Sequence, residues 1–157
     1  MSQPNSVGFV VADANILIAI CSKEPKLAIA QSALANYASK NWEFYAPNVI
    51  VSEVLYVLCQ KVQTSAITMA VYDQAIEIFK DYMSVILPPP SGEAALIKRA
   101  KEIRDGYGCS RSSDCLYIAL AEQLSKRGST EILTFDTGIT NQVTKHVPTV
   151  NVSFLPI

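Results

Sequence analysis

Two short segments, each followed directly by an aspartate, constrain the fold of this chain most strongly. Residues 7–12 form a continuous apolar run that stops at Asp13, and residues 131–135 form a strand-length segment that stops at Asp136. Short apolar runs bounded by polar or turn-forming residues are typical of strands buried on both faces of a parallel sheet. We therefore expect both segments to be strands of one sheet, with the two aspartates at the edge where those strands end.

Helical patterns separate these strands. The expected helices span residues 16–21, 27–39, 47–62, 65–83, 91–107 and 113–127, with a short one from residue 138. Further strands are expected at 44–45, 84–87 and 150–152. This alternation predicts an α/β fold, a three-layer α/β/α sandwich with a central, mainly parallel sheet. The chain has 157 residues without a repeat or linker, so we expect a single domain over 1–157.

Charge and composition exclude several classes of protein. The formal net charge of -1 argues against a general nucleic-acid binder with a broad cationic surface, so any RNA contact must be local. The four cysteines lack CxxC spacing and only one histidine is present, so zinc is not expected. The first 20 residues lack a basic leader and are interrupted by Asp13, which predicts a cytoplasmic protein without a signal peptide or membrane span.

Glu53 is the most informative acid, because it lies on an apolar helix. Its neighbours one helical turn away, Val49, Ile50 and Val57, are all apolar, and the helix over 47–62 is expected to be mostly buried. A buried carboxylate is normally neutralised, paired or bound to a metal. The alternative is that Glu53 lies on a narrow solvated strip of this helix.

The other three acids have simpler explanations when each is taken alone. Asp13 and Asp136 could cap the helices that follow them, and Asp114 suits the first turn of its helix because of the helix dipole. Together with Glu53, however, they place four like charges in one crevice. A bound cation makes such a group tolerable near neutral pH, and an oxygen-only ligand set favours Mg²⁺ or Mn²⁺. Carboxylates and a metal-bound water suggest phosphate-ester chemistry.

The segments around these acids resemble the PIN domain nucleases, including the VapC-like ribonuclease toxins, over nearly the whole chain. The matching segments are VVADAN at 10–15, VSEVL at 51–55, SDCLYIALA at 113–121 and LTFD at 133–136. The resemblance implies that Asp13, Glu53, Asp114 and Asp136 bind one or two divalent ions that activate water for in-line attack on RNA. We expect the three aspartates to hold the main ion and Glu53 to act directly or through water.

The resemblance has further implications. Asn15 and Thr134 match polar positions that support the acids. The VapC-like branch generally pairs with a small antitoxin and forms dimers, so the resemblance implies both partners here, and the 17% of charged residues is compatible with a buried interface. The chain is thus expected to be a metal-dependent endoribonuclease and the toxin of a toxin-antitoxin pair.

One basic stretch leads directly to Asp114. It is the best candidate for a rim that contacts RNA phosphates, and it contains Lys98, Arg99, Lys101, Arg104 and Arg111. The alternative is a solvated helix face with local ion pairs. Nearby Tyr107 and Tyr117 could stack on bases, although tyrosines beside apolar residues are more often in a core or interface, and neither is assigned a role.

Two other functions compete with the nuclease. A non-catalytic PIN scaffold that binds RNA or protein would be expected to lose acids, whereas all four matching positions are filled. A phosphoacceptor receiver-like domain also carries aspartates and magnesium at a sheet edge, but its acidic pair and its late lysine are not apparent. A metal-dependent ribonuclease therefore fits the sequence best.

Overall fold

A parallel four-stranded sheet forms the centre of the computed structural model, which describes residues 8–109 and 111–156. The strands are β1 (Phe9–Ala12), β2 (Glu43–Tyr45), β3 (Thr130–Thr134) and β4 (Asn151–Phe154), in the order β2-β1-β3-β4. Every neighbouring pair is parallel, and β1 pairs with both β2 and β3. The expected parallel sheet is confirmed, although Val7, expected in the first strand, lies outside the described residues.

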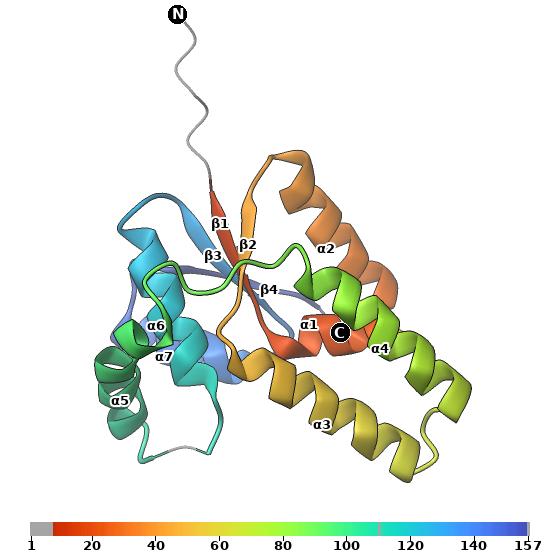
Figure 1. Ribbon diagram of the computed structural model, residues 1–157. Helices are drawn as coiled ribbons and strands as arrows, with labels where there is room; N and C mark the ends of the chain where they lie inside the picture. The colour runs from red at the N-terminus through yellow and green to blue at the C-terminus, as the bar shows by residue number, and fades with distance from the viewer. Residues whose placement is uncertain (1–7, 110, 157) are drawn as a thin grey trace, which may run out of the picture.

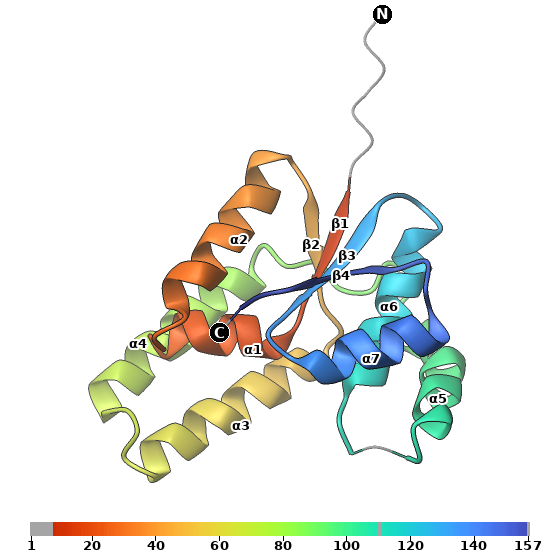
Figure 2. The same cartoon turned by 180° about the vertical axis from the view of Figure 1, so that it is seen from behind.

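Helices cover both faces of this sheet, as Figures 1 and 2 show, with α2 and α4 on one side and α5 and α6 on the other. The helices are α1 (Ala14–Cys21), α2 (Leu27–Ser39), α3 (Val49–Gln63), α4 (Met69–Met83), α5 (Ile97–Gly106), α6 (Asp114–Ser125) and α7 (Thr137–His146), with a 3-10 turn at Glu93–Leu96. Because successive strand residues face opposite ways, Val10 and Val11 belong to different core clusters. The expected three layers are therefore present.

The expected strand at 84–87 is wrong. The segment instead continues the turn that ends α4, since the N–H groups of Val85 and Ile86 both donate to the carbonyl of Tyr82. Only Leu87 joins the sheet, through an isolated parallel bridge to Tyr45. Three prolines at 88–90 follow, and their missing N–H groups prevent further pairing.

The burial expected for α3 is also wrong. Ile50, Val54 and Leu58 are fully buried, but Val51, Leu55 and Tyr56 are exposed, the last two by 41% and 62%. A helix that is apolar nearly all round does not reveal which of its faces meets the core. We call Val51, Leu55 and Tyr56 the outer face of α3. Within the described residues, no helix is both long and apolar enough to cross a membrane.

Candidate active site

The ends of β1 and β3 bring the first and last acids to the same edge of the sheet. Ala12 is the register partner of Leu133, and the N–H of Asp13 donates to the carbonyl of Leu133 at 3.0 Å. Asp136 follows two residues after β3 ends at Thr134. Parallel pairing of these two strands therefore accounts for the placement expected from the sequence.

Asp13 is buried and bound to a neighbouring strand. Its side chain is 6% exposed, and its Oδ2 accepts a 2.7 Å hydrogen bond from Thr134 Oγ1. Although Asp13 occupies the N-cap position of α1, its side chain makes no capping hydrogen bond. Simple helix capping therefore does not explain this residue.

Thr134 is the centre of a small polar network around Asp13. Its Oγ1 also accepts hydrogen bonds from Asn15 Nδ2 at 3.3 Å and from the N–H of Asp136 at 2.9 Å. In turn, Asn15 Oδ1 accepts from the N–H of Phe135 at 3.2 Å. The two residues expected to support the acids thus connect the start of α1 with the end of β3.

Glu53 and Asp114 each accept a hydrogen bond from a buried neutral donor. Half-buried Glu53, on α3, accepts from the hydroxyl of Tyr117 on α6 at 2.8 Å. Asp114, the first residue of α6, accepts on Oδ2 from Nε2 of Gln142 on α7 at 3.0 Å. These contacts tie α3, α6 and α7 together at the same edge of the sheet.

Asp136 differs from the other three acids. It is exposed, and its Oδ1 accepts from the N–H of Gly138 at 2.8 Å, so it caps α7. The capping alternative therefore holds for this residue. Asp136 still contributes to the site, because its charge raises the pKa of Asp114.

The four acids interact electrostatically, and we refer to Asp13, Glu53, Asp114 and Asp136 as the acidic edge. Burial raises the pKa of Asp13 to about 7, with further increases from Asp114 and Glu53 that Thr134 opposes. Burial and the charge of Asp114 likewise raise the pKa of Glu53, while the hydrogen bond from Tyr117 lowers it. Burial is also the main cause of the raised pKa of Asp114. Such mutual repulsion favours a positive charge at this edge.

The acidic edge is not a closed set of metal ligands. Within the described part of the chain, no three His, Cys, Asp or Glu side chains converge closely enough to hold a metal ion. Their charges are near enough to raise the pKa of Asp13, Glu53 and Asp114, but each acid is turned toward its own hydrogen-bond donor. Their chemistry, carboxylate oxygens without cysteine or histidine, still fits a hard cation such as Mg²⁺.

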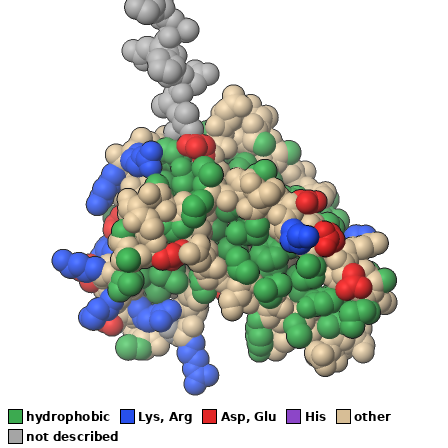
Figure 3. All heavy atoms as spheres, in the orientation of Figure 1, with side chains coloured by type: hydrophobic (Ala, Val, Ile, Leu, Met, Phe, Trp, Pro, Cys, Tyr) green, Lys and Arg blue, Asp and Glu red, His purple; other side chains and the backbone are tan. Residues whose placement is uncertain are grey.

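The basic stretch before Asp114 only partly matches a free cationic rim. Arg99 pairs with Glu102 and Glu122, and Lys101 pairs with Asp105, as the local ion-pair alternative expects. Arg104 donates from Nη2 to the carbonyl of Ser112 at 2.8 Å. Lys98 and Arg111 are exposed and have no ion pair among the described residues. Figure 3 shows most of the visible Lys and Arg atoms on the side of α5 and α6.

Sequence reasoning missed two contacts at this edge. Tyr117 could have been connected with the site, because it lies three residues after Asp114 and so projects from a neighbouring position on the same helix. Gln142 gave no comparable signal, since nothing in the sequence pairs a glutamine with an aspartate 28 residues earlier. Tyr117 is 0% exposed, which excludes the base-stacking role considered for it.

Comparison with known proteins identifies related folds. The family model for the PIN domain matches residues 10–143. A chain of VapBC2 from Rickettsia felis, bound to a DNA fragment from their promoter, is similar with a TM-score of 0.64 and 12% identity, covering 94% of this chain and 99% of that chain. A chain of FitAB bound to the IR36 DNA fragment is similar with a TM-score of 0.55 and 16% identity, covering 92% of this chain and 94% of that chain.

A third similar structure is PAE2754 from Pyrobaculum aerophilum, with a TM-score of 0.51 and 15% identity, covering 93% of this chain and 84% of that chain. Comparison with curated proteins gives no match. At these identities the structural likeness establishes the fold, and the family match covers both ends of the acidic edge, since Asp13 and Asp136 lie within residues 10–143.

Proposed function

Because the chain belongs to the PIN domain family, we propose that it is a divalent-metal-dependent endoribonuclease that hydrolyses RNA phosphodiester bonds. PIN domains are generally nucleases. The observation that carries the proposal is the acidic edge, in which carboxylates from four separate segments lie close enough that their charges raise the pKa of Asp13, Glu53 and Asp114. A protein without use for a cation gains nothing from this repulsion.

The three aspartates would hold the main Mg²⁺ or Mn²⁺ ion, and Glu53 would bind it directly or through water. A bound cation would lower the pKa of a coordinated water and neutralise charge that develops on the phosphate. Thr134 and Asn15 keep the Asp13 carboxylate at the end of β1, and Gln142 keeps that of Asp114 at the start of α6. These fixed donors limit the motion of the acids before substrate arrives.

RNA would approach along the basic stretch formed by Lys98, Arg99, Lys101, Arg104 and Arg111. Lys98 and Arg111 are its best phosphate contacts, because both are exposed and neither is neutralised by an ion pair among the described residues. Within this stretch, Arg104 is held against the carbonyl of Ser112, two residues before Asp114. Such contacts would orient the strand without selecting its sequence.

We further propose that the protein is the toxin of a toxin-antitoxin pair and forms a homodimer. The similar VapBC2 and FitAB structures are complexes bound to DNA. This chain offers two apolar surfaces for protein partners. One is the outer face of α3, and the other is a cavity of about 430 Å³ whose walls include Leu17 of α1, Leu34 of α2 and Tyr82 of α4.

One observation favours a second candidate, a non-catalytic PIN scaffold. Within the described residues no three of the acids converge as metal ligands, so the edge could serve binding alone. Catalysis with and without a chelator separates the two functions.

The test is RNA cleavage by the purified protein with Mg²⁺ or Mn²⁺, with EDTA, and with the variants Asp13→Asn and Asp114→Asn. We expect cleavage only with metal and a rate at least about 100-fold lower in both variants. Asp73→Asn, which changes an exposed acid on α4, is the matched control and should cleave normally. Metal-independent cleavage, or undiminished cleavage by both variants, would reject the proposal.

A further inference from the structure

Tyr117 is buried beside the acidic edge, and the metal and RNA contacts proposed above do not include it. We infer that Tyr117 is a positioning residue whose hydroxyl orients the Glu53 carboxylate toward the cation. This inference rests on the proposed function, because it gives Glu53 a role as a direct or water-mediated metal ligand. Tyr117 lies in the matching segment at 113–121, but the resemblance to the PIN domain nucleases gave it no role in the chemistry.

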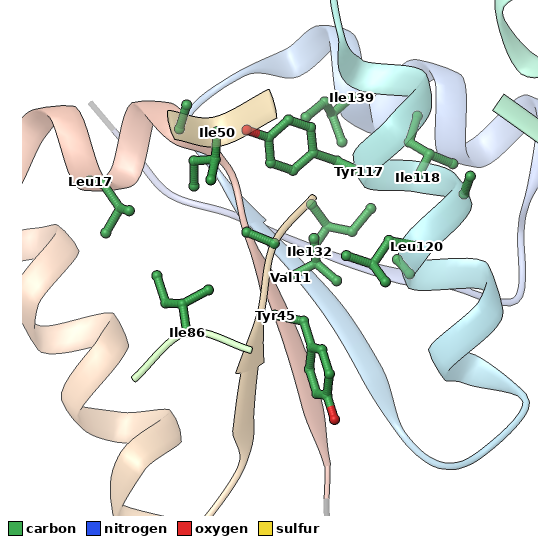
Figure 4. Packing of buried hydrophobic residues seen from close by; sticks show 14 of the residues in the cluster. Val11, Leu17, Tyr45, Ile50, Ile86, Tyr117, Ile118, Leu120, Ile132 and Ile139 are labelled. Atoms are coloured by element: carbon green, nitrogen blue, oxygen red, sulfur yellow. The ribbon is translucent and has the colours of Figure 1, made fainter. Parts of the chain in front are cut away.

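The ring and the hydroxyl of Tyr117 have different surroundings, since the ring packs in the apolar core and the hydroxyl meets a carboxylate. Figure 4 shows the ring reaching from α6 toward Ile50 of α3, within the apolar core. The side chain is 0% exposed, and its hydroxyl donates to Glu53 Oε1 at 2.8 Å. A phenylalanine would fill nearly the same space, so apolar packing alone does not require the hydroxyl. The hydroxyl needs a buried acceptor, and Glu53 supplies it.

The hydrogen bond from Tyr117 connects Glu53 with α6, the helix that begins with Asp114. Tyr117 lies three residues after Asp114 on α6, while Glu53 lies on α3, 64 residues before its partner. The same helix thus provides one acid and fixes the orientation of another. With Oε1 held by the hydroxyl, Oε2 is the oxygen left to meet a cation or its water. Loss of a hydrogen bond that orients a metal-binding carboxylate typically weakens metal affinity by about 10- to 100-fold.

The test compares Mn²⁺ binding by isothermal titration calorimetry in the full-length wild type, Tyr117→Phe, Glu53→Gln and the double variant. We expect Tyr117→Phe to weaken binding by at least about 10-fold. Adding Tyr117→Phe to Glu53→Gln should cause no further loss, because the hydroxyl acts through the carboxylate. Tyr45→Phe is the matched control. Tyr45 is also buried, but its hydroxyl has no hydrogen-bond partner among the described residues, and the variant should bind Mn²⁺ as the wild type does.

The outcomes separate the two proposals. Equal Mn²⁺ affinity in the wild type and Tyr117→Phe overturns the role of Tyr117 and leaves the proposed function intact. An equal loss in the Glu53→Gln background also overturns it, because the effect would then arise from α6 and not from Glu53. A wild type that binds no Mn²⁺ overturns the proposed function and the inference together.

Should Tyr117→Phe fail to fold, Glu53→Asp tests whether the position of the Glu53 carboxylate matters to the cation. The shorter side chain withdraws the carboxylate from the hydroxyl and from the cation alike, so the inference requires weaker Mn²⁺ binding. Wild-type affinity in Glu53→Asp would overturn the inference.

Discussion

Asp13 is the one acid of the acidic edge that the fold buries almost completely. Its pKa is raised from 3.8 to about 7, chiefly by burial. Between these two pH values the unfolded chain has lost the proton while the folded chain keeps it. The free energy of unfolding must therefore fall as the pH rises through this window. A carboxylate at this position thus reduces stability near neutral pH, which is expected where function requires the charge.

Asp13→Asn should remove this pH dependence. Asparagine keeps an oxygen that can accept from Thr134, but it has no proton to lose. We expect the variant to gain free energy of unfolding relative to the wild type as the pH rises, reaching on the order of 4 kcal/mol at pH 8 and little at pH 4. Urea unfolding of both proteins in EDTA at pH 4, 6 and 8 measures this difference. A variant less stable than the wild type at pH 8 would contradict the account of Asp13.

Among the elements, α7 contacts the acidic edge through Gln142, whose amide donates to Asp114. Gln142→Glu replaces this donor with a second carboxylate of nearly the same shape. We expect a loss of about 1–3 kcal/mol in the free energy of unfolding at pH 8, and a smaller loss at pH 5, where a proton can be shared. Chemical unfolding at the two pH values tests this, with Gln31→Glu at an exposed position of α2 as the control. A loss that does not change with pH would count against like-charge repulsion.

The exposed apolar outer face of α3 allows a test of the proposed homodimer. Leu55→Lys changes an exposed apolar residue, so we expect the free energy of unfolding of the monomer to change by no more than about 0.5 kcal/mol. If this face forms the proposed homodimer, the charge should prevent association. Analytical ultracentrifugation of the variant and the wild type measures the difference. A variant that dimerises as tightly as the wild type would place the interface elsewhere.

Local patterns predicted most elements, and contacts between distant elements were the part that the sequence could not provide. The period of apolar residues predicted α2 with its observed bounds, Leu27–Ser39. The same rule failed for α3, because apolar residues nearly encircle that helix and periodicity could not distinguish its buried face. Asp13, Asp114 and Asp136 could be singled out because strand ends and a helix start place them, and Glu53 because its neighbours one helical turn away are apolar. Of their hydrogen-bond donors, Tyr117 could be linked to the site only through its spacing from Asp114, and Gln142 not at all, since pairing across 64 and 28 residues depends on how the helices pack.

For the whole molecule, the net charge of -1 limits how RNA can be held. The proposed RNA binding would have to depend on the few basic groups without an ion pair among the described residues, of which Lys98 and Arg111 are the clearest. The double variant Lys98→Gln, Arg111→Gln should bind single-stranded RNA more weakly and reduce the slope of log affinity against log salt by about 1.4, or about 0.7 for each lost phosphate contact. Fluorescence anisotropy in EDTA measures binding without cleavage.

Lys80→Gln is the control for this prediction, because Lys80 is exposed on α4 and already pairs with Glu77. It should leave the salt slope unchanged. A slope that falls equally in the control and the double variant would indicate a diffuse charge effect and not a rim beside Asp114.

The hydrogen bond between Asp13 and Thr134 joins residues 121 positions apart, and β1 pairs with β3 across the same interval. While the polypeptide is being made, Asp13 therefore leaves the ribosome long before its partner has been translated. A nascent chain that stops short of β3 has neither the strand that fixes Asp13 nor the segment that carries Asp136. Under the proposed function, the molecule would lack a complete acidic edge throughout its own synthesis, and a translation product truncated before residue 130 would never acquire one.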